Sequence, residues 1–211
     1  MTNSINPEVW AQLGVSRESL ARLEVLAEVL VSWQRQINLI APSTLSEIWT
    51  RHILDSAQLL PLFPTQVKAI ADLGSGGGFP SLVLAAIQPA EVHLYESNAK
   101  KAAFLQEALR QMEVRAVVHR ERLEPQKAPL HMPKVQLVTA RAFAPLYELL
   151  GYAEPFFAGG ATGLFHKGQD VDAELTQAAK SWKISAQKHL SQTDSRAVIL
   201  DVKEISRAHR K

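Results

Sequence analysis

The hydrophobic and polar positions divide the chain into a helical segment and a longer segment in which strands and helices alternate. In Leu20–Ile37, large apolar residues recur every three or four positions, which is typical of an amphipathic helix. A shorter helix is expected before it, and another from Ser43 or Ser46 to about Leu60. The pattern therefore predicts a helical extension over residues 1–65.

From residue 66 onward, short apolar runs alternate with amphipathic stretches. The predicted strands are Val67–Asp72, Val92–Glu96, Val114–His119, Val135–Ala140 and Thr162–His166. The predicted helices are Phe79–Gln88, Asn98–Met112, Leu146–Phe157 and Val171–Ala179. Two late strands, Ile184–Leu190 and Val198–Ile205, are expected to pair as an antiparallel hairpin. Strands that alternate with helices indicate an α/β protein with a doubly wound, mostly parallel sheet. Residues 66–211 are expected to form this domain, in one compact unit with the extension.

The composition excludes several kinds of chemistry. The 211 residues include no cysteine, which excludes disulfides, cysteine-ligated zinc, iron–sulfur clusters and a thiolate nucleophile. The 7 histidines show no metal-ligand spacing, and we predict no metal. A net charge of +2 is too small to indicate nucleic-acid binding by itself. Because no apolar run is long enough to span a membrane and the N-terminus does not resemble a secretory signal, we expect a cytoplasmic protein with no membrane partner.

The strongest local motif is the glycine cluster that follows the first predicted strand. The segment Asp72-Leu-Gly-Ser-Gly-Gly-Gly-Phe-Pro joins this strand to a helix, an order that lets the backbone approach a nucleotide-like ligand closely. Glu96 ends the second predicted strand, where a carboxylate can accept hydrogen bonds from ribose hydroxyls. The two features together indicate a ligand that contains a nucleoside.

Two classes of ligand compete for this loop. A dinucleotide fingerprint requires Gly-x-Gly-x-x-Gly, but its third glycine position is Phe79 when counted from Gly74 and Ser81 when counted from Gly76. The loop instead reads acidic-x-Gly-x-Gly-x-Gly, which suits S-adenosylmethionine because that cofactor has no pyrophosphate. Glu96 fits both classes. A nucleotide-linked oxidoreductase therefore remains an alternative.

Further motifs add a resemblance to one family. They are Asn38-Leu39, Arg51-His52-Ile53-Leu54-Asp55-Ser56, Glu96-Ser97 with Lys100-Lys101 and Phe104-Leu105, Arg122-Leu123-Glu124, Ala140-Arg141-Ala142, and Lys167-Gly168 with Glu174-Leu175. With the glycine loop, they resemble in type and order the signature of the RsmG (GidB) family of bacterial 16S rRNA guanine-N7 methyltransferases. The resemblance covers most of the chain. It departs at Ser81, where the family commonly has glycine, and in a slightly long loop at residues 125–133.

The resemblance implies a Rossmann-like, S-adenosylmethionine-dependent methyltransferase fold and a set of functional residues. The residues implied to bind S-adenosylmethionine are Gly74, Phe79, Glu96, Leu123, Glu124 and Arg141. The residues implied to act in catalysis are Arg141, His52 and Arg51. The residues implied to bind RNA are Arg51, Lys100, Lys101, Arg122 and Lys167. The implied partner is 16S rRNA or the small ribosomal subunit, with the target guanine in the decoding-region loop, and a monomer is expected.

The reaction implied by this resemblance agrees with what the sequence lacks. The lone pair of guanine N7 lies in the ring plane and is already nucleophilic, so catalysis requires positioning and no general base. The chain has Ala140-Arg141-Ala142 where enzymes that methylate exocyclic amines often have Asn/Asp-Pro-Pro-aromatic, and it has no cysteine for methylation of pyrimidine C5. A non-catalytic RNA-binding assembly factor with a vestigial cofactor pocket is the remaining alternative.

Overall fold

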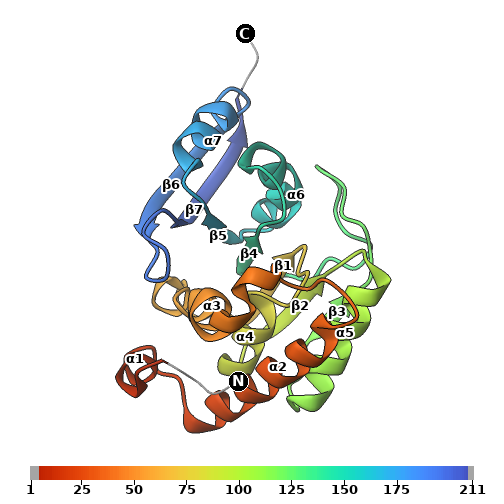
Figure 1. Ribbon diagram of the computed structural model, residues 1–211. Helices are drawn as coiled ribbons and strands as arrows, with labels where there is room; N and C mark the ends of the chain where they lie inside the picture. The colour runs from red at the N-terminus through yellow and green to blue at the C-terminus, as the bar shows by residue number, and fades with distance from the viewer. Residues whose placement is uncertain (1–4, 209–211) are drawn as a thin grey trace.

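A seven-stranded sheet forms the centre of the computed structural model, which describes residues 5–208 (Figure 1). The strand order is β3-β2-β1-β4-β5-β7-β6. The strands are β1 (Ala69–Leu73), β2 (Glu91–Tyr95), β3 (Val117–His119), β4 (Leu137–Arg141), β5 (Thr162–Lys167), β6 (Trp182–Leu190) and β7 (Val198–Arg207). The first five are parallel, and β7 runs antiparallel to both β5 and β6. The predicted doubly wound sheet with a C-terminal antiparallel hairpin is confirmed.

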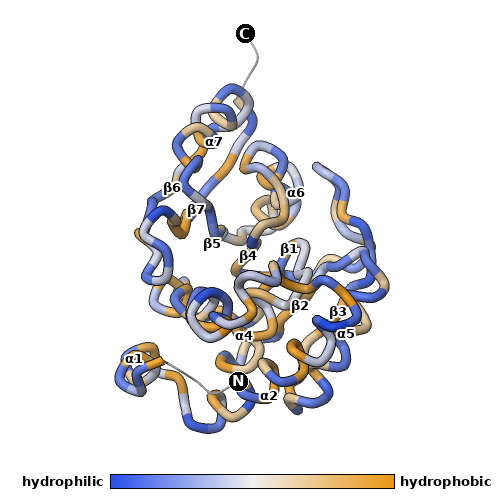
Figure 2. Tube along the Cα trace, in the orientation of Figure 1, coloured by the Kyte–Doolittle hydropathy of each residue, from blue (hydrophilic) through white to orange (hydrophobic). Residues whose placement is uncertain are grey.

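Helices cover both faces of the sheet. Successive strand residues point to opposite faces, and apolar residues on both faces are buried against helices. In β1, Ile70 packs into one hydrophobic cluster, and Ala69 and Ala71 pack into the other. The first cluster contains residues of α4 (Ser81–Ile87) and α5 (Ala99–Gln111), and the second contains residues of α6 (Leu146–Ala158) and α7 (Val171–Ala178). In Figure 2 the edge strand β6 is mostly hydrophilic.

The N-terminal helices pack on the face that carries α4 and α5. They are α1 (Pro7–Gln12) and α2 (Arg17–Gln34). Ser16 caps α2, since its hydroxyl oxygen accepts a hydrogen bond from the backbone N–H of Ser19 at 3.0 Å. The inward face of α2, with Leu23, Leu26 and Leu30, belongs to the same cluster as α4 and α5. Within residues 5–208, no helix is both long and apolar enough to cross a membrane.

The helix predicted from Ser43 or Ser46 to about Leu60 is not a single regular helix. The structure divides this stretch into a 3-10 helix (η1, Pro42–Glu47), a π-helix (η2, Trp49–Leu54), one α-helical turn (α3, Asp55–Ala57) and a second 3-10 turn (η3, Leu60–Leu62). The carbonyl of His52 accepts two hydrogen bonds, one from the backbone N–H of Asp55 and one from the hydroxyl of Ser56 at 2.6 Å. π-turns inside helical segments occur frequently at functional sites.

Strand β3 begins three residues later than predicted. The residues before it close helix α5, because the backbone N–H of Val114 donates to the carbonyl of Leu109 at 3.1 Å. Glu113 has a φ of 54° and occupies the position that usually carries glycine in this type of helix ending. The apolar run that begins at Val114 therefore contains both a residue that closes α5 and the start of β3, and the hydrophobic pattern alone could not separate them.

We predict that residues 5–65 and the sheet unfold together. Leu23→Ala opens a cavity at a fully buried position (0% exposed), so the free energy of unfolding should fall by about 2–5 kcal/mol. Tryptophan fluorescence and circular dichroism should give coincident urea transitions in both proteins. Leu190→Ala, at a position that is 82% exposed, is the control and should change the free energy of unfolding by less than about 0.5 kcal/mol. Two separate transitions would show that the extension is an independent domain.

Candidate functional site

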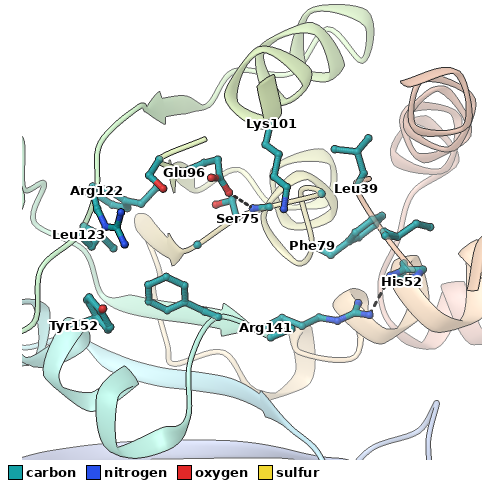
Figure 3. Close-up of a pocket in the computed structure, with 18 of the residues that line it drawn as sticks. Leu39, His52, Ser75, Phe79, Glu96, Lys101, Arg122, Leu123, Arg141 and Tyr152 are labelled. Atoms are coloured by element: carbon teal, nitrogen blue, oxygen red, sulfur yellow. Dashed lines mark hydrogen bonds between the residues drawn. The ribbon is translucent and has the colours of Figure 1, made fainter. Parts of the chain in front are cut away.

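A pocket of about 680 Å³ opens at the carboxyl ends of β1, β2 and β4. Its floor is the glycine loop at residues 74–77, and its walls come from segments 95–97, 121–123 and 141–143. Residues 39–41 of the N-terminal segment close one side. In Figure 3, Leu123 and Tyr152 lie at one end of the pocket, Arg141 and His52 lie at the other, and Glu96 lies between the two ends.

The glycine loop is in close contact with two other segments. A Cβ atom on Gly74, which has a φ of 70°, would overlap the ring of Phe143, which follows β4. A Cβ atom on Gly77 would lie 2.7 Å from the carbonyl oxygen of Leu39. Close packing therefore requires glycine at both positions, and at Gly74 the positive φ requires it as well. The contact with Leu39 places the N-terminal segment directly over the loop.

Glu96 is buried, and its carboxylate connects the ends of β1 and β2. One oxygen accepts a hydrogen bond from the backbone N–H of Gly76 at 2.9 Å, and the other accepts one from the backbone N–H of Asn98 at 2.7 Å. Each carboxylate oxygen can accept a second bond. The side chain is therefore held in one orientation while acceptor capacity remains.

Arg141, the last residue of β4, is held by the π-helical segment. Its Nη2 donates to the carbonyl of Arg51 at 2.9 Å and lies 3.0 Å from Nδ1 of His52. Because a guanidinium can only donate, Nδ1 must accept, and the proton of neutral His52 is on Nε2. Nε2 lies 2.7 Å from the hydroxyl of Thr44, which in turn donates to the carbonyl of Ala41 at 2.8 Å. The hydrogen-bond chain therefore determines the tautomer of His52.

The environment keeps His52 neutral. Burial, followed by the neighbouring charge of Arg141, lowers the pKa of His52 to about 3. The guanidinium of Arg141 also lies 3.1 Å from the carboxylate of Asp55 and 5.9 Å from the centre of the Phe79 ring. The carboxylate of Asp55 raises the pKa of Arg141, which opposes the larger lowering by burial. Arg141 thus presents a fixed positive charge at one end of the pocket.

Eight of the predicted site residues line this pocket. They are Gly74, Phe79, Glu96, Leu123, Arg141, His52, Lys101 and Arg122. Among the four that do not, Lys100 is exposed on α5, and Glu124 is 59% exposed and paired with Lys127. Lys167 is only 8% exposed, and its ammonium group lies 2.7 Å from the carboxylate of Glu174.

Arg51, the fourth, lines a second pocket of about 570 Å³ beside the first. Its guanidinium lies 2.9 Å from the carboxylate of Asp194, in the turn between β6 and β7. Arg141 and the two residues after it line both pockets. The π-helical segment therefore directs His52 toward the first pocket and Arg51 toward the second.

Comparison with known proteins identifies the family. The family model described as rRNA small subunit methyltransferase G (GidB) matches residues 19–200. This chain belongs to that family. A protein named Ribosomal RNA small subunit methyltransferase G from Rhodospirillum rubrum is 49% identical over 205 residues, covering 97% of this chain and 100% of that protein. One of the same name from Paramagnetospirillum magneticum is 47% identical, covering 95% of this chain and 96% of that protein.

Solved structures support the fold at much lower sequence identity. A putative O-methyltransferase from Klebsiella pneumoniae has a TM-score of 0.55 at 15% identity, covering 85% of this chain and 90% of that one. A putative S-adenosyl-L-methionine-dependent methyltransferase from Methanococcus maripaludis has a TM-score of 0.54 at 11% identity, covering 77% of this chain and 91% of that one. The GidB-family chain therefore has the Rossmann-like methyltransferase fold that its sequence predicts.

The sequence did not identify several residues of the GidB-family pocket. Phe143 and Tyr152 pack together at one end, with ring centres 4.9 Å apart. Tyr95 and Glu121 line the same pocket. The position of Phe143, two residues after Arg141, could have indicated it, because residues that follow a parallel strand lie at the ligand-binding edge of the sheet. No sequence signal distinguishes Tyr152 from an ordinary residue of a packed helix.

We predict that His52 makes the stability of the protein sensitive to acid. Its pKa is lower in the folded state than the ordinary value of 6.5, so below pH 6.5 the unfolded chain binds more protons. The free energy of unfolding should therefore fall as pH decreases, and His52→Gln should remove a slope approaching about 1.4 kcal/mol per pH unit. Urea titrations between pH 5 and pH 7 measure the free energy of unfolding and therefore its slope with pH. His131→Gln, at an exposed position, is the control, and parallel curves for wild type and His52→Gln would contradict the prediction.

A second prediction concerns the contact between the glycine loop and the N-terminal segment. Gly77→Ala should lower the free energy of unfolding by about 1–3 kcal/mol, because the new methyl group meets a backbone carbonyl that cannot rotate away. Gly168→Ala is the matched control, since a Cβ atom there meets nothing within 4 Å. Equal stability of the two variants, measured by urea unfolding, would show that the N-terminal segment moves away from the loop at little cost.

Proposed function

We propose that this chain transfers a methyl group from S-adenosylmethionine to N7 of a guanine in 16S rRNA, in the decoding-region loop of the small ribosomal subunit. The relatives named Ribosomal RNA small subunit methyltransferase G support the class of substrate. The observation that carries the proposal is the position of Arg141, which is held by His52 and Asp55 where the two pockets meet.

The chemistry of the pocket fits S-adenosylmethionine. Leu123 and Tyr152 offer apolar surface for adenine, the free acceptor capacity of Glu96 suits ribose hydroxyls, and Arg141 with Phe79 faces the amino acid end (Figure 3). When bound, S-adenosylmethionine supplies a methyl carbon that the lone pair of guanine N7 can attack as the bond to sulfur breaks. No proton has to be removed in this reaction.

The residues at the junction suit this reaction because neither Arg141 nor His52 has to act as a base. Arg141 stays protonated, and both ring nitrogens of neutral His52 are engaged with Arg141 and Thr44. Arg141 can donate to guanine O6, which lies beside N7 on the same edge of the base. An arginine that holds O6 would orient N7 toward the methyl group, so that catalysis consists of positioning.

Basic side chains around the first pocket suit contacts with the RNA backbone. Lys100 and Arg122 are exposed, and Lys101 is half-buried at the pocket wall. Arg51 adds positive charge beside the second pocket. We expect these four residues to contact phosphates, and such contacts weaken as salt concentration rises. Lys167 also lines the second pocket, with its ammonium group paired to Glu174, and its contact with RNA stays a prediction.

Family membership favours the methyltransferase over a nucleotide-linked oxidoreductase. The non-catalytic assembly factor differs from the enzyme in one measurable property, which is turnover. Transfer of labelled methyl from S-adenosylmethionine to small subunits lacking the modification, followed by mapping of the methylated nucleotide, tests the proposal. Cofactor binding without transfer to naked 16S rRNA or to small subunits would favour the assembly factor.

We predict that Arg141→Lys lowers kcat for methyl transfer by about 10²–10³-fold, the usual cost of removing one preorganised donor. Lysine keeps a positive charge near Asp55, so the variant should remain folded, whereas Arg141→Ala leaves that buried carboxylate unpaired. Steady-state transfer to small subunits measures the effect. Arg115→Ala, an exposed arginine near the amino end of β3, is the control for general loss of positive charge. Near-wild-type kcat for Arg141→Lys would exclude the positioning role.

A further inference from the structure

The carboxylate of Glu121 has unused hydrogen-bonding capacity inside the first pocket. Glu121 follows β3 by two residues and lines the pocket beside Arg122 and Leu123. Its Oε1 is buried and has no hydrogen-bond partner among residues 5–208. A buried acceptor without a donor is unfavourable unless a ligand supplies one. This oxygen is therefore available to a donor on a ligand in the pocket.

The neighbouring side chains do not supply that donor. The hydroxyl of Tyr95 has one proton, which it donates to the backbone carbonyl of His131 at 3.1 Å. The negative charge of Glu121, after burial, raises the pKa of Tyr95, which keeps the phenol protonated. Glu124, the carboxylate that the family resemblance implies for this subsite, pairs with Lys127 and does not line the pocket. Glu121 is thus the carboxylate that faces this end.

The strand register places Glu121 one subsite beyond Glu96. Tyr95 at the end of β2 is paired with His119 at the end of β3, and the backbone N–H of Glu96 donates to the carbonyl of His119 at 3.1 Å. Glu96 and Glu121 therefore follow the ends of adjacent strands along one edge of the sheet. A nucleoside whose ribose lies at Glu96 would place its base at the end of the pocket that Glu121 lines.

The chemistry of this end of the pocket matches adenine. Leu123, Phe143 and Tyr152 provide apolar and aromatic surface for a flat ring, as Figure 3 shows for Leu123 and Tyr152. An ionised carboxylate can only accept hydrogen bonds, and the 6-amino group of adenine donates them. Hypoxanthine has an oxygen at the same position, which would face the carboxylate without a donor.

We infer that Glu121 recognises the 6-amino group of the cofactor's adenine and excludes the 6-oxo analogue. The inference rests on the proposed use of S-adenosylmethionine, and it assigns base selectivity to Glu121 in place of Glu124. A site built around such a donor discriminates strongly against an analogue that lacks it, because the buried acceptor is then left unpaired.

Calorimetry with S-adenosylhomocysteine and its deaminated analogue, S-inosylhomocysteine, tests this assignment. The wild type should bind the adenine compound at least about tenfold more tightly, the scale of one charge-assisted hydrogen bond. Glu121→Ala should remove most of this preference by weakening adenine binding, and Glu121→Gln should reduce it because an amide can also donate to the 6-oxo group. Glu124→Ala is the matched control and should keep the wild-type preference.

A second measurement separates recognition from a structural role. Because the buried oxygen of Glu121 has no partner, Glu121→Ala should leave the melting temperature of the ligand-free protein unchanged or higher, while the affinity for S-adenosylhomocysteine falls. Loss of melting temperature in parallel with affinity would overturn the inference, as would an unchanged preference in Glu121→Ala. Failure of the wild type to bind S-adenosylhomocysteine at all would instead refute the proposed function.

Discussion

The site depends on the way one buried charge, that of Arg141, is held by a segment far away in the sequence. The guanidinium receives support from the carbonyl of Arg51, the ring of His52 and the carboxylate of Asp55. A buried charge is tolerated only when it is paired and hydrogen-bonded. The short, irregular helices η1, η2 and α3 meet this requirement, because the π-turn directs three polar groups to the end of β4.

The same cluster joins both ends of the chain to the sheet. Asp55 also accepts a hydrogen bond from the hydroxyl of Thr193, and the side-chain carbonyl of Gln58 accepts one from the backbone N–H of Gln192 at 2.8 Å. These bonds place the turn between β6 and β7 beside α3 (Figure 1). Arg141 is therefore supported from the N-terminal segment and, through Asp55, from the C-terminal hairpin. Preorganisation of this kind is what a reaction that depends on positioning requires.

The first pocket contains polar side chains that the protein already holds by hydrogen bonds and one carboxylate oxygen that has no hydrogen-bond donor within the described part of the chain. Glu96 and His52 are held by hydrogen bonds to the protein, so their orientations are set before a ligand arrives. Glu121 differs, because one of its oxygens is buried without a donor. A site in which most polar groups are satisfied and one is not is selective for a ligand that supplies the missing partner. The unsatisfied group thus indicates the chemistry of the ligand.

The sequence alone determined the order of strands and helices, the glycine loop and most of the residues around it. Apolar periodicity and glycine requirements act over a few neighbouring residues, so a linear pattern records them. Only the tertiary structure decided that the segment after Pro42 is irregular, that Lys167 is buried against Glu174, and that Glu121 rather than Glu124 lines the pocket. These outcomes depend on contacts such as that of Thr193 with Asp55, across 138 positions, which no local pattern encodes.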